Sequence, residues 1–123
     1  MSTATRKRTP LSLDATLERI EQRHRALMHQ LADTDIVLRG SIAARLTRCG
    51  QPTCRCKADP PTLHGPYWFW TRKVAGKTVN VRLSPEQAAR CKAWSRNMRK
   101  ADRILRQVQA LGLRAAQSVR QHT

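Results

Sequence analysis

Three cysteines and one histidine lie close together in the middle of the chain, at Cys49, Cys54, Cys56 and His64. Thiolate sulfur and imidazole nitrogen are ligands that structural zinc ions prefer, and three of the first with one of the second complete a tetrahedron. The glycine and prolines among them are typical of turns that bring separate ligands around one ion. The spacing predicts a structural Zn²⁺ site, with a loop of reduced thiols as the alternative.

Other chemistry fits these residues less well. The fourth cysteine, Cys91, lies in a segment of helical periodicity and is predicted to be a small buried side chain rather than a ligand. There is no C-x-x-C pair for redox chemistry, and no Asn or Asp stands out as the third member of a Cys–His nucleophilic site. The acidic residues are too scattered to hold Mg²⁺. We therefore expect no enzymatic activity.

The charge of the chain indicates the class of partner. Its 123 residues include 24 Lys and Arg but only 8 Asp and Glu, for a formal net charge of +16. Repulsion among these charges favours a polyanionic partner. The chain lacks an apolar run of about 18 residues that would span a bilayer, and its amino terminus lacks the apolar segment of a signal peptide. These features predict a cytoplasmic protein that binds nucleic acid, DNA rather than RNA, and no membrane.

The first of two predicted helices covers about residues 12–33. Ser12 is the expected N-cap, and Asp14 falls in the first turn. Its seam has alternating steps of four and three residues, as in a coiled coil. The seam consists of Leu13, Leu17, Ile20, His24, Leu27 and Leu31.

The second predicted helix covers about residues 85–121. Ser84 and Gln87 form a capping-box pattern around Pro85, and Gly112 marks a point of weakness or a break. Its expected seam consists of Trp94, Met98, Ala101, Leu105, Val108, Ala115 and Val119. The two seams predict packing of the helices on each other, on the sheet, or across a homodimer.

Between the helices, the spacing of apolar residues changes to the alternation that is typical of strands. From Gly40, one predicted strand places Ile42, Ala44 and Leu46 on one face and Ser41, Ala43, Arg45 and Thr47 on the other. Residues 66–84 predict a β-hairpin with Gly76 in a type I turn with a bulge. Pairing of Lys73 with Lys77 makes a core face of Tyr67, Phe69, Val79, Val81 and Leu83. The opposite face then carries Trp68, Trp70, Arg72, Thr78, Asn80 and Arg82.

These elements predict an α+β fold. An N-terminal helix precedes a small three-stranded antiparallel sheet with the Cys/His metal knuckle, over about residues 36–84, and a long C-terminal helix follows. We expect residues 1–11 to be a disordered basic tail and residues 12–123 to be a single domain.

Several short motifs of the central region occur together in a known family. These motifs are Gly40-Ser41, Arg48-Cys49-Gly50, Pro52, Cys54-Arg55-Cys56, His64-Gly65-Pro66-Tyr67 and Gly76-Lys77. With them, the chain resembles a family of short bacterial proteins of unknown function. The resemblance covers about residues 36–85, and members commonly have Lys where this chain has Gln51. Members are often encoded near transposases and recombinases, which implies a mobile-element context.

The hairpin is also similar to the arm-type DNA-binding domains of tyrosine recombinases, in which a three-stranded sheet lies in the major groove. This likeness implies a reading face of Arg45, Thr47, Trp68, Trp70, Arg72, Thr78, Asn80 and Arg82. The candidate nucleic-acid contacts are Arg45, Arg48, Arg55, Trp68, Trp70, Arg72, Lys77, Asn80 and Arg82. The two indoles suit stacking on unpaired bases, with burial under a helix as the alternative.

The sequence thus predicts a non-enzymatic, zinc-stabilised nucleic-acid-binding protein, accessory to a mobile genetic element. The alternative is an oligomeric interaction module, such as a transposase or recombinase accessory subunit or an antitoxin-like partner. In that case the helical seams would form the functional surface.

Overall fold

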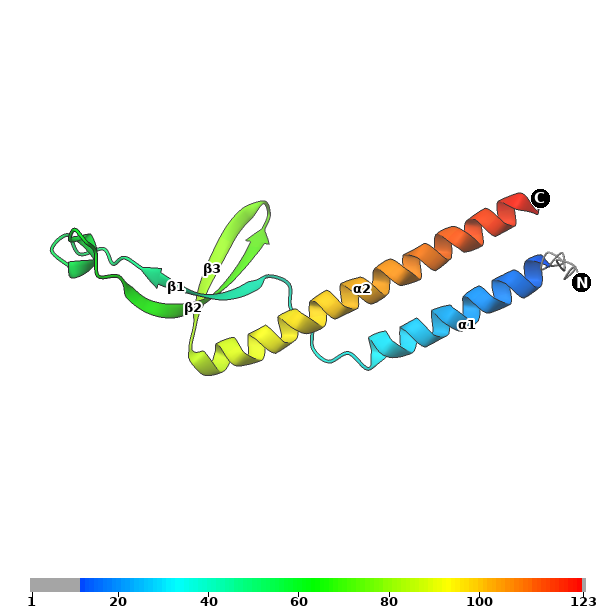
Figure 1. Cartoon of the computed structure of the whole chain (residues 1–123), viewed down its shortest axis with the longest axis horizontal. Helices are drawn as coiled ribbons and strands as arrows, with labels where there is room; N and C mark the ends of the chain where they lie inside the picture. The colour runs from blue at the N-terminus through cyan, green and yellow to red at the C-terminus, as the bar shows by residue number, and fades with distance from the viewer. Residues whose placement is uncertain (1–11, 123) are drawn as a thin grey trace, which may run out of the picture. The chain divides into compact units, whose positions relative to one another are not determined.

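A computed structural model describes residues 12–122 of the chain (Figure 1). The predicted basic tail, residues 1–11, lies outside the described residues. Two helices flank a three-stranded antiparallel sheet, so the predicted α+β fold is confirmed. The described residues form two compact units, one of residues 12–33 with 102–122 and one of residues 34–101. The long helix α2 (Pro85–Gln121) contributes to both units.

Helix α1 (Leu13–Ala32) has the predicted start. The hydroxyl oxygen of Ser12 accepts a hydrogen bond of 3.2 Å from the backbone N–H of Ala15, which satisfies one of the free donors in the first turn. Asp14 lies in that turn, where a negative charge interacts favourably with the helix dipole. At the other end, the backbone N–H of Asp33 donates to the carbonyl oxygen of His29 at 3.0 Å.

The helical unit is held together by one apolar seam. Ile20 and Leu27 of α1 pack with Ile104 and Leu111 of α2, and all four are buried. The two helices run antiparallel, so that α1 begins near the end of α2 (Figure 1). Leu31, Val108 and Ala115 pack around this core. Of the three arrangements predicted for the helical seams, packing of the two helices on each other is therefore the one observed.

Three predicted seam residues are exposed instead: His24, Leu105 and Val119. On α2 the buried positions are Ala101, Ile104 and Leu111, with Val108 half-buried between them. This path alternates steps of three and four residues, as the helical repeat requires. Leu105 and Val119 lie one position beside it, so the prediction was wrong for these two residues.

Helix α2 begins at the predicted capping box. The backbone N–H of Gln87 donates to the Ser84 hydroxyl at 3.2 Å, and the Gln87 side chain accepts from the Ser84 N–H at 2.9 Å. The helix then continues through Gly112 without a break. A helical glycine costs only about 1 kcal/mol relative to alanine. Burial of the adjacent Leu111 offsets that cost. None of the described helices is long and apolar enough to cross a membrane.

The sheet consists of β1 (Ser41–Thr47), β2 (His64–Val74) and β3 (Lys77–Leu83), in that spatial order. A long loop with a short 3₁₀ helix, η1 (Arg55–Lys57), connects β1 to β2. The predicted strand from Gly40 and the predicted hairpin are both present. The β1–β2 ladder is regular from Ser41 to Arg45 and shifts before Thr47, which pairs with His64.

The register of the β2–β3 hairpin differs from the prediction by one residue. Val74 pairs with Lys77, whereas the predicted partner of Lys77 was Lys73. The turn therefore holds only Ala75 and Gly76, at φ of 50° and 79°, rather than a longer turn with a bulge. Two residues of positive φ are the signature of a type I′ turn, whose twist matches that of the strands. The shift exchanges the side chains that share a face.

The segment before β1 is tied to the first half of α2. The backbone N–H of Leu38 donates to the carbonyl oxygen of Trp94 at 3.1 Å. The buried Ser95 hydroxyl donates to the carbonyl oxygen of Gly40 at 3.0 Å. The Asn97 amide donates to the carbonyl oxygen of Ile36 at 2.9 Å. These bonds satisfy one backbone donor and two backbone acceptors of the segment before β1 and hold the start of β1 against α2.

Candidate functional site

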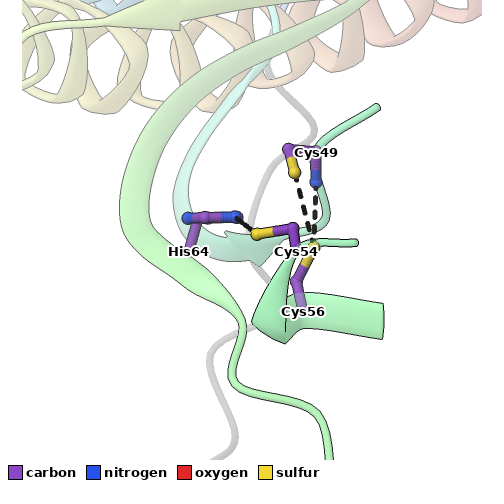
Figure 2. Close-up of side chains that lie close together, drawn as sticks. All are labelled: Cys49, Cys54, Cys56 and His64. Atoms are coloured by element: carbon purple, nitrogen blue, oxygen red, sulfur yellow. Dashed lines mark hydrogen bonds between the residues drawn. The ribbon is translucent and has the colours of Figure 1, made fainter. Parts of the chain in front are cut away.

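The four predicted metal ligands come together at the end of the β1–β2 ladder. Cys49 follows β1 by two residues, Cys54 and Cys56 lie at and within η1, and His64 is the first residue of β2. Their ligand atoms all lie within 4.8 Å of one another. Figure 2 shows the three sulfur atoms and the imidazole facing a common centre. The predicted Cys/His cluster is therefore present.

The distances within this cluster suit a tetrahedral ion. The Sγ atoms of Cys49 and Cys56 are 3.6 Å apart, and Cys54 Sγ is 3.2 Å from His64 Nε2 (Figure 2). Around a tetrahedral ion, Zn–S bonds of about 2.3 Å and Zn–N bonds of about 2.0 Å place two sulfur atoms about 3.8 Å apart and a sulfur and a nitrogen atom about 3.5 Å apart. All three cysteines are free thiols. The donor set and its spacing therefore fit a tetrahedral metal ion.

Backbone hydrogen bonds hold the loop in this conformation. The N–H of Cys49 donates to Cys56 Sγ at 3.4 Å, so a backbone donor is directed at a ligand sulfur. The carbonyl oxygen of Arg55 accepts from Ala58 at 3.1 Å and from Thr62 at 3.0 Å. Cys56 is fully buried, with an exposed fraction of 0%. The Cys49 bond to a cluster sulfur is of the kind that orients the ligands of known metal sites, and the Arg55 bonds hold the turn around it.

Hydrogen bonds also shift the pKa values of the thiols. A hydrogen bond from the Cys56 backbone and a second from the Cys49 side chain lower the pKa of Cys54. A hydrogen bond from the Cys49 backbone lowers the pKa of Cys56, against the opposing effect of burial. A bond from the Gln51 backbone lowers the pKa of Cys49, but side-chain bonds and burial together raise it above its ordinary value. Two of the three thiols thus favour the thiolate, which is the form that binds metal.

Cys91 is not part of this cluster. It lies on α2 and is half-buried, and the group of ligands that the structure describes consists of the four predicted residues alone. Its assignment to the helix rather than to the metal site therefore agrees with the sequence analysis.

The sheet presents two chemically distinct faces. We call the first the polar face; it consists of Ser41, Ala43, Arg45, Tyr67, Phe69, Thr71, Lys73, Thr78, Asn80 and Arg82. We call the second the indole face; it consists of Ile42, Ala44, Trp68, Trp70, Arg72, Val74, Lys77, Val79, Val81 and Leu83. The assignment follows from the observed register, because side chains directly opposite in a ladder share a face.

On the indole face, both tryptophans are half-buried and already in contact with cations. The guanidinium of Arg72 lies 3.8 Å from the centre of the Trp70 ring, and Lys92 Nζ of α2 lies 4.3 Å from that of Trp68. Trp70 Nε1 donates to the carbonyl oxygen of Arg39 at 2.9 Å. These contacts fix the indoles within this unit, and both rings are half-buried rather than buried under a helix.

On the polar face, two arginines lie over two aromatic rings. The guanidinium carbon of Arg82 is 3.5 Å from the centre of the Tyr67 ring, and that of Arg45 is 4.5 Å from the centre of the Phe69 ring. Asn80 Oδ1 accepts from the Thr71 hydroxyl at 2.7 Å and from Arg45 Nη2 at 3.2 Å. Arg45, Asn80 and Arg82 are all exposed. The face thus presents positioned cations and an amide to solvent.

The predicted contact residues divide among three places. Arg45, Asn80 and Arg82 lie on the polar face, and Trp68, Trp70, Arg72 and Lys77 lie on the indole face. Arg48 and Arg55 are exposed and lie in the connection between β1 and β2 that carries the cysteines. The predicted register placed Tyr67 and Phe69 on the core face, so their contacts with the arginines were not predicted. Interpreting Ala75-Gly76 as a two-residue turn would have given the observed register and placed both rings on the same face as the arginines.

A comparison with protein families agrees with the resemblance that the motifs of the central region indicated. The model of a family described as "Domain of unknown function (DUF6788)" matches residues 17–93, which include the four residues of the Cys/His cluster and the whole sheet. No curated protein and no solved structure matches the chain. Because the match covers more than half of the sequence, this chain belongs to the DUF6788 family of proteins of unknown function.

Proposed function

We propose that this protein binds nucleic acid, DNA rather than RNA, without catalysing a reaction, and that a structural zinc ion supports the binding surface. The polar face carries the proposal, because Arg45 and Arg82 are held there over aromatic rings in a chain of net charge +16. A ring contact leaves N–H groups of the guanidinium to donate to other ligands. These groups match phosphate and base acceptors.

The partners of these arginines leave their charge available. Arg82 contacts the Tyr67 ring, and Arg45 contacts the Phe69 ring and the amide oxygen of Asn80. Rings and amides carry no formal charge, so these contacts position each guanidinium without neutralising it. This arrangement favours a polyanionic ligand over a neutral one.

A second group of cations increases the positive charge of the same unit. Lys92, Arg96 and Arg99 of α2 line a cleft of ≈ 110 Å³ together with Ser41, Ile42 and Ser95. Phosphate contacts of this kind supply most of the sequence-independent affinity for nucleic acid, and they make that affinity depend on salt.

A zinc ion is the metal that the donor set fits best. Three thiolates and one imidazole form an ordinary set for structural zinc and complete its tetrahedron, which leaves no position for a substrate or a reactive water. The bound cluster would carry a net charge near −1, beside the cationic Arg48, Arg55 and Lys57. The ion would clamp the loop at the end of the β1–β2 ladder, next to the Arg45–Tyr67 pair.

Binding to equal-length duplex DNA, duplex RNA and single-stranded DNA over a series of salt concentrations tests this proposal. Each phosphate neutralised on duplex DNA lowers log K by about 0.9 for each unit rise in log salt. We expect a slope steeper than about −3 on duplex DNA and weaker binding to duplex RNA. Absence of binding to every probe at low salt, or a slope near zero, would contradict the proposal.

An oligomeric interaction module is the second candidate function. It is favoured by exposed apolar side chains on the helical unit, where Met28, Leu105, Leu113 and Val119 have exposed fractions of 38%, 44%, 60% and 43%. In that case the chain would serve as an accessory subunit of a transposase or recombinase, or as an antitoxin-like partner. Light scattering across a range of concentrations tests this alternative, because a monomer at every concentration would leave a self-association role without support.

A further inference from the structure

Asn80 has a fixed orientation on the polar face. Its side-chain amide lies beside Arg45 Nη2, and guanidinium nitrogens can only donate hydrogen bonds. The amide atom that faces Arg45 must therefore be the oxygen. Across the strand pair, the Thr71 hydroxyl donates to the same oxygen at 2.7 Å. The two bonds together direct the amide nitrogen away from the network.

This network decides what Asn80 can recognise. A carbonyl-type oxygen has two lone pairs, and the Oδ1 atom of Asn80 already accepts two hydrogen bonds. An asparagine reads adenine through a bidentate contact in which its oxygen accepts from the N6 amino group. Because that oxygen is occupied, Asn80 has only the two N–H groups of its amide nitrogen left to offer a ligand.

The neighbouring arginines offer groups of the same kind. Arg45 and Arg82 are exposed, lie over rings, and have only N–H donors. The remaining hydrogen-bonding capacity of Arg45, Asn80 and Arg82 therefore consists entirely of donors. Since guanidinium groups already cover Tyr67 and Phe69, these rings are poorly placed to stack on unpaired bases. The face thus suits a paired ligand that presents acceptors.

We infer that the polar face reads guanine in the major groove of duplex DNA, an inference that rests on the proposed function. Guanine presents two adjacent acceptors there, O6 and N7, whereas adenine presents one acceptor beside an amino group, thymine one acceptor beside a methyl group, and cytosine an amino group. The B-form major groove admits a β-ribbon, so strands can carry side chains to base edges. Asn80 and the two arginines supply the donors, and other basic residues contact the phosphates.

Replacement of one nucleobase atom tests this inference on the wild-type protein. The probes are duplexes of about 20 base pairs that contain G·C pairs, the same duplexes with every guanine replaced by 7-deazaguanine, and A·T duplexes of equal length. All three have the same number of phosphates, and 7-deazaguanine pairs normally but lacks the N7 acceptor. A bidentate base contact accounts for about 5- to 150-fold discrimination. We expect at least about 5-fold weaker binding to both control duplexes.

The outcomes separate this inference from the proposed function. Equal binding to the guanine and 7-deazaguanine duplexes would overturn the inference but leave nucleic-acid binding intact. Tighter binding to single strands than to duplexes would overturn it as well. No binding to any probe at low salt would overturn both proposals.

A matched pair of variants tests whether the Asn80 amide is the group that contacts guanine. Asn80→Asp keeps the shape of the side chain and the acceptor for Arg45 but removes the N–H donors. Gln109→Glu makes the same change of charge at an exposed position of α2 outside the sheet. We expect Asn80→Asp to bring the ratio of affinities for the guanine and 7-deazaguanine duplexes close to one. Gln109→Glu should keep the wild-type ratio. An unchanged ratio in Asn80→Asp would exclude Asn80 as the reading group.

Discussion

The indole nitrogen of Trp70 donates a hydrogen bond of 2.9 Å to the carbonyl oxygen of Arg39, two residues before β1 begins. This bond joins the central strand to the segment that leads into the edge strand. The buried Ser95 hydroxyl donates to the next carbonyl along the chain, that of Gly40. The chain therefore passes through Gly40 between an indole on one side and α2 on the other, and this close passage makes Gly40 sensitive to substitution.

Gly40→Ala should destabilise the protein by about 2–4 kcal/mol. Gly40 has a φ of 113°, which residues other than glycine rarely adopt. An added Cβ would lie 2.5 Å from Trp70 Nε1 and 2.7 Å from the carbonyl oxygen of Thr71. Gly112→Ala is the control, because a Cβ at Gly112 meets no atom within 4 Å and alanine is the better helix former. That variant should gain about 0.5–1 kcal/mol. Urea denaturation measures both, and equal stability of the two variants would contradict the prediction.

Cys54→Ser should abolish stoichiometric metal binding. Cys54 Sγ lies 3.2 Å from His64 Nε2 within the four-ligand cluster, and a serine hydroxyl is a poor ligand for a soft site. Cys91→Ser removes a thiol outside the cluster and should retain about one equivalent of zinc per chain. Elemental analysis of protein purified without chelators measures both variants. A wild-type content below about half an equivalent would instead favour the loop of reduced thiols.

The Cys/His cluster was predictable from sequence because its four residues lie within one short segment. Cys49, Cys54, Cys56 and His64 belong to a single connection, so their proximity depends on local turns rather than on the register of distant strands. The helix starts at Ser12 and Ser84 were predictable for the same reason, since capping involves residues three positions apart.

The faces of the sheet were not predictable in this way, because they depend on the length of one turn. Lys73 and Val74 are both plausible partners for Lys77, and the choice between them moves every side chain of β3 to the opposite face relative to β2. The four consecutive aromatic residues of β2, Tyr67 to Trp70, put two rings on each face in either register, so they do not decide between the two pairings. The actual choice sets Arg82 opposite Phe69 and Asn80 opposite Thr71, and so creates the polar face.

Ala75→Asn should stabilise the hairpin by about 0.5–1 kcal/mol. Ala75 has a φ of 50°, and Asn followed by glycine is the preferred pair in a type I′ turn. Ala75→Val should cost about 1–2 kcal/mol, because a β-branched side chain is strained at positive φ. Chemical denaturation of the two variants measures the difference. Destabilisation by asparagine with no effect of valine would indicate a different turn and hence a different register.

Leu27→Ala should destabilise the helical unit by about 2–5 kcal/mol. Leu27 has an exposed fraction of 1% and packs in the seam with Ile20, Ile104 and Leu111, so its truncation leaves a cavity in a small core. The adjacent Met28 is 38% exposed, and Met28→Ala should change stability by less than about 1 kcal/mol. Because the metal ligands lie in the other compact unit, both variants should retain the wild-type metal content. Loss of metal in Leu27→Ala would instead show that the two units fold as one.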